Sequence, residues 1–233
     1  MLALVVVALG YGSATSGGFS EGQTALGLGL IIATVFSLRG HVLTRPVLLI
    51  TLALSICLCL GCASFKMQQP YQWWGLREPA VHEATESLSI PALHGIAVSP
   101  ATKAAIEGVT AAIDSASQPG DDVFVFPHIP IFYLLSDRYP STFTLVQWFD
   151  FASRRAVEDD LRRIERRPPR VIVIAEIPET VYDAHEDMFA NGAVSAQREM
   201  RDGLMRLIRT AAYRQAGAWP VYDGYRIVVY VAR

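Results

Sequence analysis

Residues 121–141 read DDVFVFPHIPIFYLLSDRYPS, and they contain the clearest element boundaries of the chain. Residues 123–126 are wholly apolar, which is typical of a short strand that a sheet buries on both faces. Pro127 and Pro130 end this strand, because proline cannot donate to a sheet ladder. Residues 131–135 then begin a short helix. A buried strand followed by a helix is the repeating unit of an α/β domain.

The segments on either side continue this alternation. Ser99 and Pro100 start a helix, since serine caps a first turn and proline fits the first helical position, and the apolar spacing carries it to about Ala116. The other predicted elements are strands at residues 91–98 and 171–175, helices at residues 154–167 and 197–215, and a hairpin of residues 219–221 and 226–231 around the turn YDGY at residues 222–225.

These elements predict an α/β domain over residues 91–233, with a mainly parallel sheet and an antiparallel C-terminal hairpin at its edge. Residues 66–90 are predicted to link this domain to the preceding segment. Tyr71, Trp73 and Trp74 suit a membrane interface, where aromatic side chains gather, or a buried aromatic anchor of the domain.

Charge is distributed unevenly along the chain. The chain is 52% hydrophobic and 18% charged, and residues 1–65 contain only Glu21, Arg39 and Arg45 as charged groups. The formal net charge of −2 lacks the basic footprint of a nucleic-acid binder, so no nucleic-acid partner is expected. All three cysteines lie within residues 57–62, which leaves the polar part without a disulfide framework or a cysteine metal site.

Two uncharged stretches near the start are long enough to cross a bilayer. Residues 22–38 reach about 26 Å and residues 46–65 about 30 Å, at ~1.5 Å per residue, and both are predicted as transmembrane helices. Residues 1–11 are too short to span. They are predicted as the remnant of a longer helix in a truncated chain, or as a short helix packed beside the other two. Two arginines place the connector between the spans in the cytoplasm, which puts the α/β domain outside it.

The candidate ligand contacts follow the strand at residues 123–126. Ligands bind to α/β sheets beyond the carboxyl ends of the strands, so His128, Tyr133 and Arg138 are predicted to contact a phosphate or a sugar. The structural alternative is that the prolines fix the turn, the aromatic side chains fill the core, and Arg138 pairs with a nearby carboxylate.

No established catalytic motif is present in the sequence, so no catalytic residue, metal site or cofactor is predicted. A Gly-rich phosphate loop, a GxSxG turn and an HExxH helix are all absent. Residues 185–187 (HED) diverge as neighbours in sequence and are predicted to lie in a solvated loop. The arginines of residues 162–170 alternate with Asp159, Asp160 and Glu165, which predicts a solvated, ion-paired helix face.

Residues 119–143, PGDDVFVFPHIPIFYLLSDRYPSTF, resemble a pattern in the soluble C-terminal domain of bacterial GT-C-type membrane glycosyltransferases. These include the protein mannosyltransferases and the aminoarabinose transferases that act on lipid A. The pattern reads PGxx(I/V)FVxPxxPxxYxL(S/T)xR, and an Arg/Glu-rich helix and a PPRV strand follow it, as at residues 168–174 here (PPRVIVI). In that family the domain follows the last membrane helices, so the resemblance covers residues 22–233.

The resemblance implies transfer of a sugar from a polyprenyl-phosphate donor to an acceptor outside the cytoplasm. The family's catalytic carboxylate lies in the first extracytoplasmic loop, whereas Glu21 is the sole carboxylate before residue 78 and does not sit in the family's motif. The expected function is therefore acceptor recognition or assembly with other membrane chains, without catalysis by this chain alone. The expected partners are the lipid bilayer, polyprenyl-phosphate sugars or other membrane chains.

Two alternatives stay open at this point. One is a membrane-anchored scaffold of the cell envelope that has no carbohydrate chemistry. The other is an enzyme of a different class that uses His128 and neighbouring carboxylates.

Overall fold

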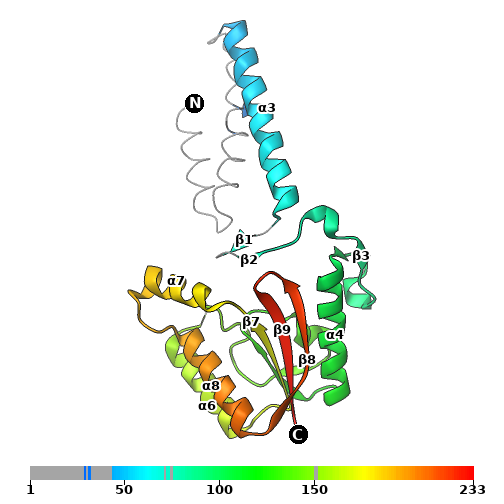
Figure 1. Ribbon diagram of the computed structural model, residues 1–233, viewed down its shortest axis with the longest axis vertical. Helices are drawn as coiled ribbons and strands as arrows, with labels where there is room; N and C mark the ends of the chain where they lie inside the picture. Colours follow the sequence, from blue (N-terminus) through cyan, green and yellow to red (C-terminus); the bar gives the residue numbers. More distant parts are fainter. Residues whose placement is uncertain (1–28, 30, 33–43, 71, 74–75, 150–151) are drawn as a thin grey trace. The chain divides into compact units, whose positions relative to one another are not determined.

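The computed structural model describes residues 29, 31–32, 44–70, 72–73, 76–149 and 152–233. The chain forms two compact units (Figure 1), of which the first contains the helix α3 (Arg45–Gln68) and the second contains residues 83–149 and 152–233 together with Leu76. The predicted helix at residues 1–11 lies outside the described residues, as do most of the predicted span at residues 22–38 and the connector residue Arg39.

Helix α3 confirms a helix at the second predicted span and extends it to Gln68. Its 24 residues reach about 36 Å at ~1.5 Å per residue, and it is the one helix among the described residues that is long and apolar enough to cross a membrane. The hydroxyls of Thr51 and Ser55 donate to the carbonyl oxygens of Val47 and Thr51 at 2.8 and 2.7 Å. Both hydroxyls are thus satisfied within the helix, as an apolar surrounding requires.

Short elements connect α3 to the second unit. The strands β1 (Gln72–Trp73) and β2 (Leu76–Arg77) pair with each other, and a 3-10 turn, η1 (Val81–Glu83), follows. Of the three predicted interfacial aromatics, Tyr71 and Trp74 lie outside the described residues and Trp73 belongs to β1.

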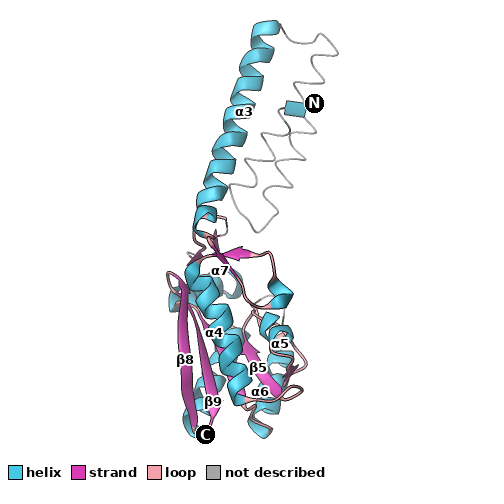
Figure 2. Ribbon diagram, turned by 90° about the vertical axis from the view of Figure 1, so that its right-hand side faces the viewer, coloured by secondary structure: helices cyan, strands magenta, loops and turns pink. Residues whose placement is uncertain are grey.

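The second unit begins with strands and helices in alternation, followed by two helices and a hairpin (Figure 2). Its elements are β3 (Glu86–Ser87), η2 (Pro91–Leu93), β4 (Ala97–Val98), α4 (Pro100–Ala116), β5 (Asp122–Phe126), α5 (Ile131–Leu135), β6 (Tyr139–Pro140), α6 (Arg154–Arg166), β7 (Val171–Glu176), α7 (Glu179–Ala190), α8 (Ala196–Thr210), β8 (Tyr213–Tyr222) and β9 (Tyr225–Ala232).

Five of these strands form one sheet in the order β6-β5-β7-β9-β8. Strand β5 is parallel to β6 and β7, whereas β9 is antiparallel to β7 and β8. The antiparallel C-terminal hairpin is confirmed, and its turn lies between Tyr222 and Tyr225, where Gly224 takes a positive φ of 73°. The sheet as a whole is mixed and not mainly parallel, because its parallel part ends at β7.

The prediction of a strand at residues 91–98 is wrong. The segment begins with the turn η2, and only Ala97 and Val98 are extended, pairing with β3 outside the main sheet. Gly95 adopts a positive φ of 86°, which breaks an extended run at this point. The apolar composition of the segment favours a strand, but the glycine and the proline within it prevent one.

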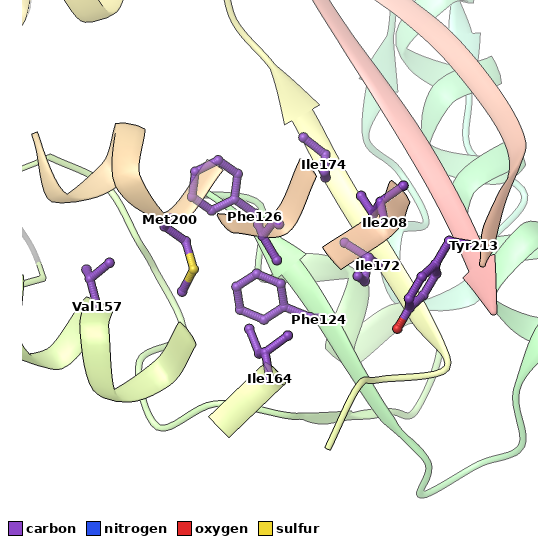
Figure 3. Packing of buried hydrophobic residues seen from close by; sticks show 10 residues of the cluster. Phe124, Phe126, Val157, Ile164, Ile172, Ile174, Met200, Ile208 and Tyr213 are labelled. Carbon is purple, nitrogen blue, oxygen red and sulfur yellow. The ribbon is translucent and has the colours of Figure 1, made fainter. Parts of the chain in front are cut away.

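Helices cover both faces of the sheet. Helix α4 packs on β8 and β9 on one face, while α6 and α8 lie on the other (Figure 1). Alternate residues of β5 and β7 point toward the face covered by α6 and α8. There Phe124, Phe126, Ile172 and Ile174 pack against Met200 of α8 (Figure 3). This alternation explains why both strands are apolar throughout, since each is buried on both faces.

The predicted serine cap at Ser99 is confirmed, and a second serine, Ser153, begins α6 in the same way. Ser99 and Ser153 each accept a hydrogen bond from the backbone N–H three residues on, at 3.2 and 3.3 Å, and so cap α4 and α6. The last predicted helix ends five residues early, at Thr210. Ala212 takes a positive φ of 56°, and β8 begins at Tyr213.

Candidate functional site

The chain leaves β5 and β7 toward opposite faces of the sheet. After β5 it enters α5, which packs against α4, and after β7 it continues through α7 into α8 on the other face. Two neighbouring parallel strands whose connections diverge in this way leave a crevice beyond their carboxyl ends. The ends of β5 and β7 are therefore the place where this fold offers a ligand site.

A cavity of about 570 Å³ lies at this place. Its size falls within the range of small-molecule sites, roughly 300–1,000 Å³. The end of β5 contributes Phe126, and the end of β7 contributes Ile174 and Glu176. Ala175 of β7 also lines the cavity, and the rest of the wall comes from the segment after β7 and from α7 and α8: Ile177, Glu179, Tyr182, Arg201, Asp202, Met205, Arg206 and Arg209.

The floor of the cavity is apolar and fixed. Phe126 is wholly buried, Ile174 is 2% exposed, and both belong to the cluster under α8 (Figure 3). Met205 is half-buried beside them on α8. An apolar or flat part of a ligand would displace water here without losing hydrogen bonds.

The carboxylates around the cavity are all engaged in ion pairs. Glu176 accepts from Arg226 of β9, and Glu179 accepts from Arg201. Arg201 also donates to Asp202 at 2.9 Å, and its guanidinium lies 4.6 Å from the centre of the Tyr182 ring. These pairs neutralise the acidic part of the wall and hold Arg201 in one orientation.

Tyr182 and Arg198 fasten α7 to α8 beside the cavity. Burial raises the pKa of Tyr182 to about 12, so its hydroxyl stays protonated. Arg198 donates to Glu186 and to Asp183 at 2.8 and 2.6 Å, and the hydrogen bond with Glu186 raises the pKa of its guanidinium further. The wall contributed by α7 is thus rigid.

His128 lies at the same edge of the sheet, two residues past β5. Its ring centre is 4.1 Å from that of Trp148 and 5.9 Å from that of Tyr225, and Nε2 is 3.5 Å from the Tyr225 hydroxyl. Burial lowers the pKa of His128 to about 4, so the ring is neutral at physiological pH. Its Nδ1 has no hydrogen-bond partner among the described residues.

The aromatic contacts continue from His128 across to α7. Phe149 stacks on His185 with ring centres 3.9 Å apart, and it meets Tyr182 edge-on at 5.4 Å. Trp148 and Phe149 come from the segment that follows β6. This row of rings fixes that segment against the ends of β5 and α7.

Tyr133 and Arg138 do not join His128 at the ligand edge. The Tyr133 hydroxyl is buried and accepts from the Val125 amide at 2.9 Å, so it supports β5 from one face. Arg138 is 6% exposed and lies near the amino end of β5, where it donates to the Ser117 hydroxyl and carbonyl at 2.8 Å. It also pairs with Asp114 at 3.3 Å, which matches the structural alternative for this residue.

Two sequence predictions of solvated residues are wrong. His185 and Glu186 lie in α7, each 6% exposed, because α7 turns this side toward α8 and Phe149. Asp160 is 3% exposed on α6 and accepts from the amides of Phe143 and Thr144 at 3.0 and 3.1 Å. The exposed part of the same helix does carry the predicted ion pairs, including Arg162 with Asp159 at 2.5 Å.

Sequence reasoning missed the cavity residues on α8. It used only the apolar face of that helix, whereas Arg206 and Arg209 stand three positions apart on the polar face. Ligands bind beyond the carboxyl ends of strands, which is why His128 was predicted as a ligand contact. The same argument applied to Glu176, at the end of β7, would have predicted this wall of the cavity.

Within the described residues, no three His, Cys, Asp or Glu side chains are grouped as metal ligands. No protein-family model matches the chain, and comparisons with curated proteins and with solved structures find no significant similarity.

Proposed function

We propose that this chain is the membrane-anchored recognition part of an envelope glycosyltransferase of the GT-C type. In this role the α/β domain binds an acceptor or a lipid-linked sugar, or assembles with other membrane chains, and does not itself transfer the sugar. The observation that carries the proposal is the cavity at the ends of β5 and β7, which has an apolar floor and a charged rim.

Helix α3 supports the membrane anchor. Its large apolar side chains are exposed, including Leu49 at 67% and Leu54 at 65%, and a bilayer is the surrounding that would cover them. Arg45 begins the helix and Lys66 lies in its last turn. A cytoplasmic start, which the positive-inside rule favours for the connector with Arg39 and Arg45, would leave the α/β domain that follows outside the cytoplasm.

The ion pairs around the cavity support recognition over catalysis. A general base must be free to take a proton from its substrate. Glu176, Glu179 and Asp202 are each held by an arginine, so none is poised for that step.

The test uses the full chain in neutral detergent. Polyprenyl-phosphate-linked glucose is titrated against it, and glucose transfer to added acceptor lipid is assayed in parallel. We expect saturable binding without turnover. Absence of binding contradicts the recognition role, and robust turnover contradicts the non-catalytic one.

A scaffold without carbohydrate chemistry is the second candidate, and a specific feature favours it. Phe143 is 88% exposed and Leu134 is 75% exposed, near the edge strand β6, and large apolar side chains at such exposure are typical of protein contacts. Crosslinking in native membranes distinguishes the two candidates. A scaffold loses its crosslinked partner in a Phe143→Ser variant and binds no lipid-linked sugar.

A further inference from the structure

Arg206 and Arg209 line the cavity and differ from its other charged residues. Both side chains are exposed, and neither forms an ion pair or a hydrogen bond with any residue that the structure describes. Every carboxylate of the wall already has an arginine partner: Glu176 has Arg226, while Glu179 and Asp202 share Arg201. These two guanidinium groups are therefore the charged groups of the wall that are left without a partner among the described residues.

The spacing of these two arginines suits a single anion. Residues three apart on a helix lie on the same face, so both guanidinium groups can turn to one ligand group. Guanidinium groups bind phosphate through paired, charge-assisted hydrogen bonds, and they lose less hydration than an ammonium does. Arg209 also lies in the last turn of α8, where a cation offsets the helix dipole, but Arg206 lies a turn earlier.

The other residues that line the cavity indicate what the rest of the ligand is like. The floor of Phe126, Ile174 and Met205 is apolar, and Tyr182 contributes an aromatic ring that Arg201 covers. A cavity of about 570 Å³ has room for a group larger than phosphate alone.

We infer that this cavity binds a phosphate group carried on a sugar or lipid body, with Arg206 and Arg209 as its anion contacts. The inference deepens the proposed function and rests on it, because it assigns a ligand chemistry to the recognition cavity. A free sugar phosphate and a phospholipid headgroup present the same chemistry to the two arginines.

Titrations of the full chain separate these two sources. Glucose 1-phosphate is titrated in neutral detergent, with glucose as the uncharged control, and binding to phosphatidic acid is measured with the chain in nanodiscs of phosphatidylcholine with and without that lipid. We expect saturable binding of at least one phosphate probe, weaker at higher salt. Binding of neither phosphate probe overturns the inference.

The variant Arg206→Gln/Arg209→Gln tests the residues. It should weaken phosphate binding by about tenfold or more, since each lost charge-assisted hydrogen bond costs of that order. Arg163→Gln is the matched control, because Arg163 is an exposed arginine in the last turn of α6 and lies outside the cavity. Equal affinity of the double variant and the wild-type chain overturns the inference.

These experiments distinguish a failure of the phosphate assignment from a failure of the proposed function. If the double variant still binds polyprenyl-phosphate-linked glucose as the wild-type chain does, the phosphate assignment is wrong and the recognition role stands. If the phosphate probes bind through the two arginines but the lipid-linked sugar does not, the assignment stands and the glycosyltransferase role is wrong.

Discussion

Asp160 shows how a single residue joins two parts of the fold. Its carboxylate accepts from the amides of Phe143 and Thr144 and from the side-chain amide of Gln147 at 2.9 Å, so it ties the segment after β6 to α6. The alternation of charges along α6 gave no indication of this role, because all three donors lie 13 to 17 residues earlier in the chain and two of them are backbone amides.

Asp160→Ala is expected to destabilise the chain by about 3 kcal/mol, because it leaves the part-buried amides of Phe143 and Thr144 without an acceptor and removes one of the two acceptors of the Gln147 side-chain amide. Denaturant unfolding of the α/β domain, followed by circular dichroism, measures this loss. Asp159→Ala is the control. It removes an exposed ion pair with Arg162 and should cost less than about 1 kcal/mol. Equal losses in the two variants would contradict the anchoring role.

His128 makes the stability of the domain depend on pH. Its pKa is about 4 in the folded chain against 6.5 for a free histidine, because burial disfavours the charged ring. The contribution of His128 to the free energy of unfolding is full above pH 6.5. It declines as the pH falls toward 4, because in that range the unfolded chain binds the proton and the folded chain does not.

The free energy of unfolding should therefore fall between pH 6.5 and pH 5 in the wild-type chain, and less steeply in His128→Gln. His94, which is exposed, supplies the control variant His94→Gln, whose pH profile should follow the wild type. Parallel profiles for His128→Gln and the wild type would show that the buried ring does not titrate in this way.

At the scale of elements, the sequence predicted those helix and strand boundaries that depend on residues close together in the chain. The serine caps of α4 and α6, the apolar runs of β5 and β7 and the turn before Tyr225 were all predictable, because each depends on neighbours in sequence. Helix α7 was missed because its buried side faces α8 through polar contacts such as Arg198 with Glu186, and polar residues give no apolar periodicity.

The strand-end rule predicted the edge of the sheet at which the cavity lies, but His128, Tyr133 and Arg138 are not among the residues that line it. His128 follows a strand end that the sequence shows, whereas Arg138 turns back to the end of α4 at Ser117, a contact 21 residues distant. No spacing rule separates an arginine that binds a ligand from one that caps a neighbouring helix.

The packing of α4 on β8 depends on Gly108. A methyl group at this position would lie 2.6 Å from Cε2 of Trp219, a contact that forces the indole or the helix to move. Gly108→Ala should therefore destabilise the domain by about 1–3 kcal/mol, although alanine favours helix by about 1 kcal/mol. Thermal unfolding measures the change.

Trp219→Ala removes the side chain that the new methyl group would meet. In that background Gly108→Ala should be neutral or stabilising, because only the helix preference of alanine remains. Loss of stability of the same size in both backgrounds would locate the strain elsewhere.

At the scale of the whole molecule, an apolar helix, α3, precedes a domain that contains a cavity. If α3 lies in a bilayer, the full chain should stay in the membrane fraction after extraction with alkaline carbonate. Transfer of the chain to the soluble fraction would contradict the anchor. If the domain lies outside the cytoplasm, as proposed, external protease should remove it in intact spheroplasts.

The most direct test is the affinity of the full chain in nanodiscs for polyprenyl-phosphate-linked glucose, compared with a variant whose cavity is filled. Met205→Trp adds bulk to the cavity wall, and Met188→Trp places the same residue at a 65% exposed position of α7 outside it. We expect saturable binding that Met205→Trp weakens at least about tenfold and Met188→Trp leaves unchanged. Equal binding by all three chains, or none by the wild type, would contradict this expectation.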